Sequence, residues 1–175
     1  MEIIQAEKKD LAEIMKFYDI MCQVLGEKSF MPGGNKGGFP SEPMVEEAIR
    51  TGSQFIGVED GRIMAAYILN HECDDSYRKA HWHISAGPDE AVVMHALRVL
   101  PEYGGRGYSK RLLEHAIRTA RERGQKAIRL DCLKENEIAD RLYRSFGFEY
   151  VDTAEIMYAD IGVPRQCLLY ELILK

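Results

Sequence analysis

The sequence lacks the features that mark a membrane, secreted or metal-binding protein. Its apolar runs are short, and residues 1–8 have neither the apolar stretch nor the cleavage site of a signal peptide. The four cysteines are far apart and form neither a Cys-x-x-Cys pair nor a zinc-ligand spacing: Cys22, Cys73, Cys132 and Cys167. We therefore expect a cytoplasmic protein with four reduced thiols, no metal and no membrane partner.

The sequence also lacks the excess of basic charge that nucleic-acid binding requires. It has 23 Lys and Arg against 28 Asp and Glu, a net charge of -5, and the basic residues at 106–129 stand among acidic ones. We expect no nucleic-acid partner and a small cationic partner instead. With 175 residues, 46% of them hydrophobic, the chain is predicted to form one domain over residues 1–175.

The first half of the sequence predicts strands, helices and one long loop. Asp60-Gly61 lies between two segments rich in β-forming residues and predicts an antiparallel hairpin. Glycines and prolines interrupt any regular pattern at 28–43, and a loop of this kind often forms one wall of a binding site. The predicted elements are a strand at 3–6, a helix from Asp10 to Gly26, the loop at 28–43, a short helix at 45–50, and strands at 54–58 and 62–69.

The second half completes an α/β domain with a mixed sheet of about seven strands and about four helices. Trp82 is predicted to lie on a short extra strand, and Ile138, Leu142 and Phe146 are predicted to face the core. The other elements are a buried strand at 92–100, a helix with apolar residues from Leu112 to Ala120, a strand at 127–132, a helix from Asn136 to Gly147, and strands at 148–156 and 166–174.

The most informative feature is the apolar strand that runs directly into a glycine-rich turn and a helix, residues 97–109. The backbone N–H groups of such a turn, together with a helix N-terminus, form an anion site that suits a pyrophosphate. Arg106 and Lys110 add positive charge to the same turn. The segment therefore predicts a phosphorylated cofactor.

This turn resembles the pyrophosphate motif of the GCN5-related N-acetyltransferase superfamily, Arg/Gln-x-x-Gly-x-Gly/Ala. Gly107 matches the central glycine, whereas Gly104 and Ser109 depart from the usual residues. Both departures still supply backbone N–H groups, and the Ser109 hydroxyl can donate to a phosphate oxygen. The resemblance implies a cofactor-binding turn of Gly104, Gly105, Arg106, Gly107, Tyr108, Ser109 and Lys110.

A second segment, residues 135–148, resembles the family's Asn-x-x-Ala-x-x-Leu-Tyr-x-x-x-Gly-Phe pattern. Asn136 and Tyr143 are about two helical turns apart and so share one face of the helix, on which Ala139 leaves room for a thin ligand. The resemblance implies that acetyl-CoA is the cofactor. It also implies that its pantetheine arm lies along this face and that the Tyr143 phenol lies near the thioester sulfur.

The resemblance further implies a mostly antiparallel sheet that splays between its fourth and fifth strands. Backbone N–H groups of the strand segment from Leu97 to Val99 would then be free to bind the pantetheine amides and the thioester carbonyl. A homodimer joined through sheet edges or the C-terminal segment also fits the superfamily.

The implied reaction is direct acetyl transfer in a ternary complex, because no cysteine lies in a motif for an acyl-enzyme. Tyr143 is the candidate hydrogen-bond donor to the sulfur, and full proton transfer from a phenol to a thiolate is uphill by ~2 kcal/mol. His95 is the candidate base, since it lies two residues before Leu97 and shares its strand face if no bulge intervenes. A buried histidine with a packing role is the alternative.

The acceptor is expected to be the primary amine of a small molecule or a protein. Glu72, Asp74 and Asp75 could attract an ammonium group, although a solvated turn is the usual role of such a run. Two alternative functions stay open: a non-catalytic sensor of acyl-CoA with the same fold, and a module that binds only the nucleotide or phosphate.

Overall fold

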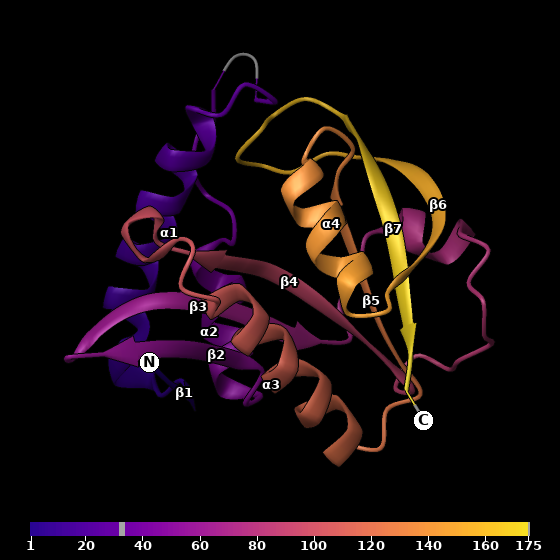
Figure 1. The fold of residues 1–175 in the computed structure, drawn as a ribbon, viewed down its shortest axis with the longest axis horizontal. Helices are drawn as coiled ribbons and strands as arrows, with labels where there is room; N and C mark the ends of the chain where they lie inside the picture. The colour runs from indigo at the N-terminus through magenta and orange to yellow at the C-terminus, as the bar shows by residue number, and fades with distance from the viewer. Residues whose placement is uncertain (32–33, 175) are drawn as a thin grey trace.

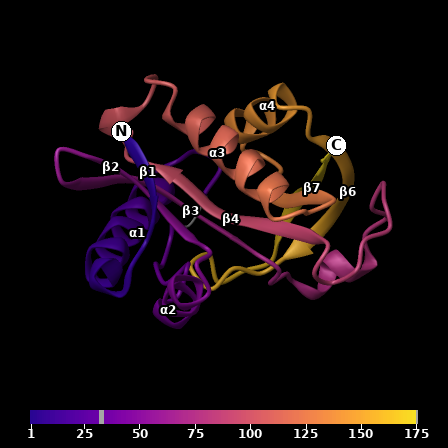
Figure 2. The same cartoon turned by 90° about the horizontal axis from the view of Figure 1, so that it is seen from below.

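The protein, in a computed structural model that describes residues 1–31 and 34–174, forms a sheet covered by helices on both faces (Figures 1 and 2). The spatial order of the strands is β1-β2-β3-β4-β5-β7-β6, and the described neighbours are antiparallel except for the parallel pair β4–β5. In chain order the strands are β1 (Glu2–Gln5), β2 (Gln54–Glu59), β3 (Arg62–Asn70), β4 (Ala91–Val99), β5 (Ala127–Leu133), β6 (Glu149–Ile156) and β7 (Arg165–Ile173). The predicted fold class is confirmed.

Two pairs of helices cover the sheet. Figure 2 shows α1 (Leu11–Gly26) and α2 (Glu42–Arg50) on one face and α3 (Tyr108–Glu122) and α4 (Glu137–Ser145) on the other. Short 3-10 helices precede α1 (Lys8–Asp10), follow β3 (Asp75–Lys79) and follow β4 (Pro101–Tyr103). The helices α3 and α4 end as predicted, because Gly124 and Gly147 follow them with φ of 68° and 84°, values that suit glycine.

The predicted hairpin between β2 and β3 is confirmed. Asp60 and Gly61 form its two-residue turn with φ of 51° and 74°, and positive φ at both positions matches the right-handed twist of the flanking strands. This hairpin places β3 beside β4, so the strand that precedes the glycine turn lies in the middle of the sheet.

The sheet splays between β4 and β5, as expected. The two strands pair only from Ala91 to Val93, opposite Ala127 to Arg129, and then diverge (Figure 1). A bulge in β4 accompanies the divergence: Ile68 is paired with His95 but Ala66 with Arg98, so β4 carries one extra residue. At the bulge, Ala96 has a φ of 49°.

Three details of the predicted fold are wrong. Ile138 is 74% exposed, because the face of α4 that contacts the core is centred on Tyr143. Trp82 lies outside any strand; its indole N–H donates to the Tyr77 carbonyl, and its ring contacts the Arg129 guanidinium at 4.3 Å. The second helix begins at Glu42, earlier than expected, because Ser41 caps it.

Residues 32 and 33 of the predicted loop lie outside the described residues. Among the helices of the described part of the chain, none has the length and apolar character needed to cross a membrane. The described residues also contain no group of three or more His, Cys, Asp or Glu side chains arranged to hold a metal ion.

Candidate active site

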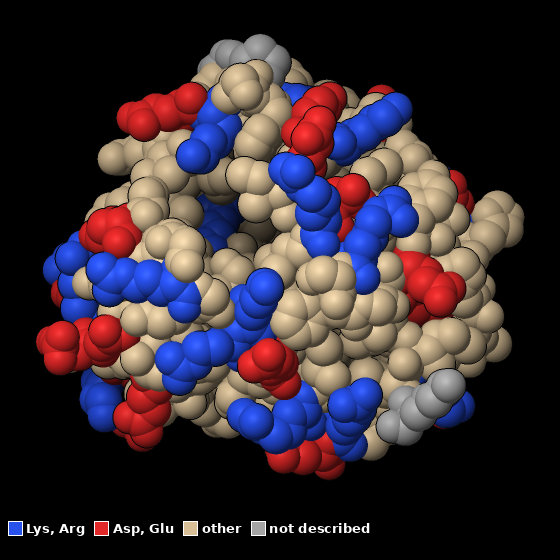
Figure 3. All heavy atoms as spheres, viewed as in Figure 1, with Lys and Arg blue, Asp and Glu red and all other residues tan. Residues whose placement is uncertain are grey.

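A cavity of about 260 Å³ lies in the gap where β4 and β5 separate. Figure 3 shows a hollow that opens on the face covered by α3 and α4, with a basic side chain visible inside it. The wall on one side is β4 at residues 96–98, and the wall on the other is β5 at 131–133 with α4. The loop after α1 and the loop between β6 and β7 close the far end.

The glycine turn forms a set of free backbone donors at the mouth of this cavity. Gly105 and Gly107 both have φ of 75°, and no atom lies within 4 Å of the positions where a Cβ would stand. Among the described residues, the N–H groups of 105–110 find no hydrogen-bond acceptor. Because α3 begins at Tyr108, its N-terminal dipole adds to these donors. The turn therefore suits a pyrophosphate, as the sequence predicts.

The side chains of the turn point to the same ligand chemistry. Ser109 lines the cavity, while Arg106 and Lys110 are exposed beside it. The Arg106 guanidinium stacks on Tyr103 at 5.1 Å, which holds a positive charge next to the free N–H groups. Tyr108 instead donates to Glu59 at 2.6 Å, so its hydroxyl anchors the start of α3 and faces away from the ligand site.

The open edge of β4 supplies further donors. Leu100 donates its N–H to Met64 of β3, and N–H groups alternate along a strand. The N–H groups of Leu97 and Val99 therefore point away from β3, toward the side where β5 no longer pairs. Leu97 itself lines the cavity. This edge can receive an extended amide-containing ligand as an added strand.

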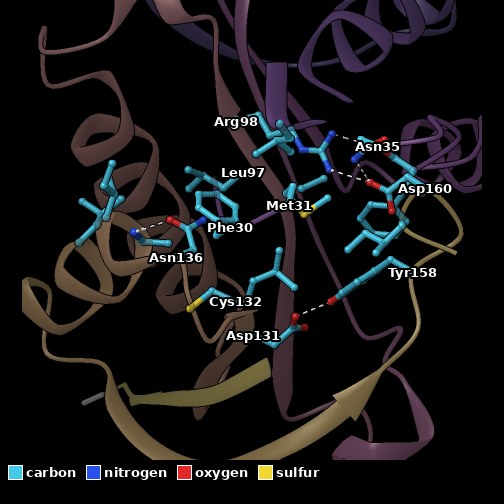
Figure 4. Close-up of a pocket in the computed structure, with 18 of the residues that line it drawn as sticks. Phe30, Met31, Asn35, Leu97, Arg98, Asp131, Cys132, Asn136, Tyr158 and Asp160 are labelled. Carbon is cyan, nitrogen blue, oxygen red and sulfur yellow. Dashed lines mark hydrogen bonds and ion pairs between the residues drawn. The ribbon is translucent and has the colours of Figure 1, made fainter. Parts of the chain in front are cut away.

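The helix α4 forms the opposite wall through the residues predicted from the second segment. Asn136 caps the helix by accepting the Ala139 N–H at 3.2 Å, so its side-chain oxygen is already used and its amide NH₂ is left for a ligand (Figure 4). Ala139 lines the cavity with a small side chain, and Ile138 lies at the exposed rim.

Tyr143 lies deeper on the same wall. Its ring packs against Phe148 and Tyr170 and is 8% exposed, yet the residue lines the cavity. Within the described part of the chain its hydroxyl has no hydrogen-bond partner. Burial, with the nearby Cys132 and Asp131, raises the pKa of Tyr143 well above its usual value. The phenol therefore stays protonated and can donate to a ligand.

His95 does not line this cavity. It lines a second cavity of about 250 Å³, which shares three residues with the first: Phe39, Asp131 and Tyr158. The bulge at Ala96 breaks the alternation on which the predicted shared face of His95 and Leu97 depended. The shared face was predicted for a strand without a bulge; that condition is not met, and His95 and Leu97 line two adjoining cavities.

The hydrogen bonds of His95 fix its protonation. Its Nε2 lies 3.0 Å from Asn70 Oδ1 and 2.9 Å from the Glu72 carbonyl, both acceptors, so Nε2 carries the hydrogen. The other ring nitrogen, Nδ1, is then a free base. Burial lowers the pKa of His95 below 6.5, which keeps the ring neutral at pH 7.

Several polar residues that line the cavities could not be identified as site residues from the sequence. Asp131 accepts hydrogen bonds from Tyr77 at 2.7 Å and from Tyr158. Asp160 accepts from Asn35 at 2.8 Å and lies 3.9 Å from Arg98 (Figure 4). These residues come from separate loops and strands, so no spacing along the chain could have grouped them.

The sequence matches the family described as Acetyltransferase (GNAT) family over residues 27–148. No curated protein matches it. Among solved structures, it is similar to an N-acetyltransferase from Staphylococcus aureus Mu50, with a TM-score of 0.73 and 17% identity, covering 99% of this chain and 98% of that one.

Two further structures share the fold at equally low identity. The Salmonella typhimurium protein YncA, named as an acetyltransferase and solved with its cofactor acetyl-CoA, gives a TM-score of 0.70 and 17% identity over 100% of this chain and 94% of that one. The polyamine N-acetyltransferase of Drosophila melanogaster has a TM-score of 0.70 and 17% identity, covering 99% of this chain and 99% of that one. Together with the anion-binding turn and the splayed sheet, the family match shows that this chain belongs to the GNAT family and is an acetyltransferase that uses acetyl-CoA.

Proposed function

We propose that the protein transfers the acetyl group of acetyl-CoA to a primary amine, of a small molecule or of a protein, by direct attack in a ternary complex. The observation that supports it is the gap between β4 and β5, where the cavity beside the glycine turn adjoins a second cavity and shares Asp131 with it. Two reactants can enter from opposite ends and meet at the splay.

The chain holds the donor through three features already described. The N–H groups of 105–110 take the pyrophosphate, the open edge of β4 takes the pantetheine amides, and α4 lines the arm with Ala139 and the Asn136 amide. When bound, acetyl-CoA supplies an activated thioester whose carbonyl carbon accepts the amine. An N–H of the Leu97 to Val99 segment can polarise that carbonyl.

In the proposed reaction the amine nitrogen forms a bond to the acetyl carbon and the carbon–sulfur bond breaks. The Tyr143 hydroxyl donates a hydrogen bond to the departing sulfur, which accounts for its buried position and unshared hydroxyl. The proton lost by the amine passes to Nδ1 of His95, directly or through water. CoA leaves with the electron pair of the broken bond and takes up a proton.

The direct test is a panel of amines assayed for release of free thiol from acetyl-CoA. We expect a subset of amines to give acetylated product and CoA in equal amounts, with intersecting initial-rate patterns for the two substrates. Tight binding of CoA without transfer to any amine of the panel, peptide N-termini included, would contradict the proposal.

Direct attack predicts that no cysteine carries the acetyl group. Cys132 lines the cavity, but burial and the neighbouring Asp131 raise its pKa to about 12, so it is a poor nucleophile. We expect Cys132→Ala to keep kcat within about threefold of the wild type. Intact-mass measurement after incubation with acetyl-CoA should show no added acetyl group; an adduct that the substitution removes would favour an acyl-enzyme instead.

The proposed base predicts the acid side of the pH profile. Because the pKa of His95 is lowered, His95 stays able to accept a proton at neutral pH, and kcat should fall only as the pH drops below about 6.5. His95→Gln should lower kcat by about 100-fold and remove that acidic limb. His71→Gln, which changes an exposed histidine outside both cavities, is the matched control. An unchanged profile in His95→Gln would assign the proton to another acceptor.

A further inference from the structure

The two cavities meet at a carboxylate. Asp131 lines both of them, together with Phe39 and Tyr158, and it lies on β5 beyond the last residue that pairs with β4. Its position on the open side of β5 places it between the donor cavity and the cavity that holds His95.

Two tyrosine hydroxyls hold the Asp131 side chain in place, and no basic side chain of the described residues pairs with it. Its two oxygens accept hydrogen bonds from Tyr77 and Tyr158, and the Tyr77 ring is 4% exposed. Burial and the adjacent carboxylate raise the pKa of both phenols, so they act as neutral donors. Among the described residues, no Lys, Arg or His nitrogen lies within 4 Å of Asp131. The site is oriented by two tyrosines and lacks a counter-ion.

The rest of the second cavity has the same sign of charge. Glu72 and Asp74 also line it, and its described lining contains no Lys or Arg. Charges of one sign on the walls of a cavity concentrate ligands of the opposite charge. Two carboxylates at the outer end and Asp131 at the inner end therefore favour a positively charged occupant.

A separate feature of the first cavity points to a donor-rich ligand. Asp160 is 3% exposed and lines the cavity near its far end, and in the described structure its Oδ1 has no hydrogen-bond partner. Its other oxygen is satisfied by Asn35, with Arg98 at 3.9 Å (Figure 4). A buried acceptor atom without a donor is costly, so this oxygen adds negative potential at the far end of the first cavity.

We propose that Asp131 is a specificity-determining residue and that the acceptor is a small amine carrying a second positive charge. This inference rests on the proposed function. The reacting nitrogen enters the splay, and the end that stays charged remains in the second cavity, with Asp131 as its fixed counter-ion and Glu72 and Asp74 beyond. The cavity of about 250 Å³ suits a short, flexible diamine or guanidino-amine.

Three amines with the same four-carbon chain test this proposal: 1,4-diaminobutane, n-butylamine and 4-aminobutanoate. We expect kcat/KM for the diamine to exceed that for butylamine by at least about tenfold and the zwitterion to be the poorest substrate. Equal rates for diamine and butylamine would overturn the inference while leaving the proposed function intact. A preference for 4-aminobutanoate would also overturn it and would point to Arg98 as the recognition group.

Two variants and one control test which residues cause the preference for the diamine. Asp131→Asn should reduce the diamine-to-butylamine ratio to within about threefold of one. Glu72→Gln, an exposed side chain whose loss does not threaten folding, should reduce the ratio by a smaller factor. Asp75→Asn removes the same charge nearby but outside the cavity lining and should leave the ratio unchanged. A ratio unaffected by Asp131→Asn in folded protein would contradict the assignment.

A binding measurement decides the question even if no amine of the panel is acetylated. Cys73 lines the second cavity and is exposed, whereas the other three cysteines are buried. With a CoA analogue that lacks the thiol bound, 1,4-diaminobutane should slow the labelling of Cys73 by a thiol reagent and butylamine at the same concentration should not. Equal protection by both, or by neither, would refute a cation site in this cavity.

Discussion

Replacing Tyr143 by phenylalanine should lower kcat for acetyl transfer by about 100-fold, with little change in the affinity for acetyl-CoA. The ring packs against Phe148 and Tyr170, and phenylalanine keeps those contacts, so the substitution removes only the hydroxyl. Tyr143 lines the cavity, and no hydrogen-bond partner of its hydroxyl is found among the described residues. In the proposed mechanism this hydroxyl donates a hydrogen bond as charge builds on the departing sulfur, so its removal should slow acetyl transfer and leave acetyl-CoA binding intact.

The measurement is the rate of CoA release in single turnovers, with a good amine acceptor. If the hydroxyl acts only as the bond breaks, kcat and kcat/KM should fall by the same factor. Tyr150→Phe removes a hydroxyl that bonds Thr153 on the exposed strand β6, and it should leave the rate unchanged. A Tyr143→Phe enzyme as fast as the wild type would remove Tyr143 from the mechanism.

Replacing Gly107 by valine should weaken CoA binding by at least about tenfold. Gly107 has a φ of 75° at the start of α3, and a β-branched residue in this conformation costs ~1–2 kcal/mol or more. The turn can relieve that strain by rotating its peptide units. The free N–H groups of 105–110 would then be reoriented, so the affinity for the pyrophosphate of CoA should fall.

Two comparisons separate lost binding from lost stability. Gly124→Val introduces the same strain at a φ of 68°, again with no atom within 4 Å, but at the far end of α3. It should lower the melting temperature as much as Gly107→Val does, and the CoA affinity measured by calorimetry should be unchanged. Pantetheine, which lacks the pyrophosphate, should bind Gly107→Val and wild type alike. Unaltered CoA affinity in Gly107→Val would show that the turn does not hold the diphosphate.

The local features of the site were predictable because short segments encode them. Asp60 and Gly61 predict the hairpin because both residue types tolerate the positive φ that its turn needs. Asn136 predicts the start of α4 because its side-chain oxygen can cap the helix. The glycines at 105 and 107 likewise predict a turn with free N–H groups. Each of these signals depends on residues within a few positions of one another.

The placement of His95 could not be predicted from the residues around it in the sequence. Alternation along β4 predicted that His95 and Leu97 share a face, but a single extra residue at Ala96 separates them into adjoining cavities. Nothing in the local sequence marks Ala96 as a bulge, since alanine rarely adopts a positive φ. The exposure of Ile138 has a similar origin, because the orientation of α4 is set by the sheet beneath Tyr143.

The sequence alone determined the family and the cofactor, because each of the two segments that carry the resemblance, residues 97–109 and 135–148, is continuous in the chain. Only the tertiary structure brought together Asp131, Tyr77 and Tyr158, which come from β5, from the 3-10 helix Asp75–Lys79 and from the loop between β6 and β7. The proposed donor recognition uses main-chain groups that one short segment supplies. The proposed acceptor recognition depends on side chains that converge only after the sheet has splayed.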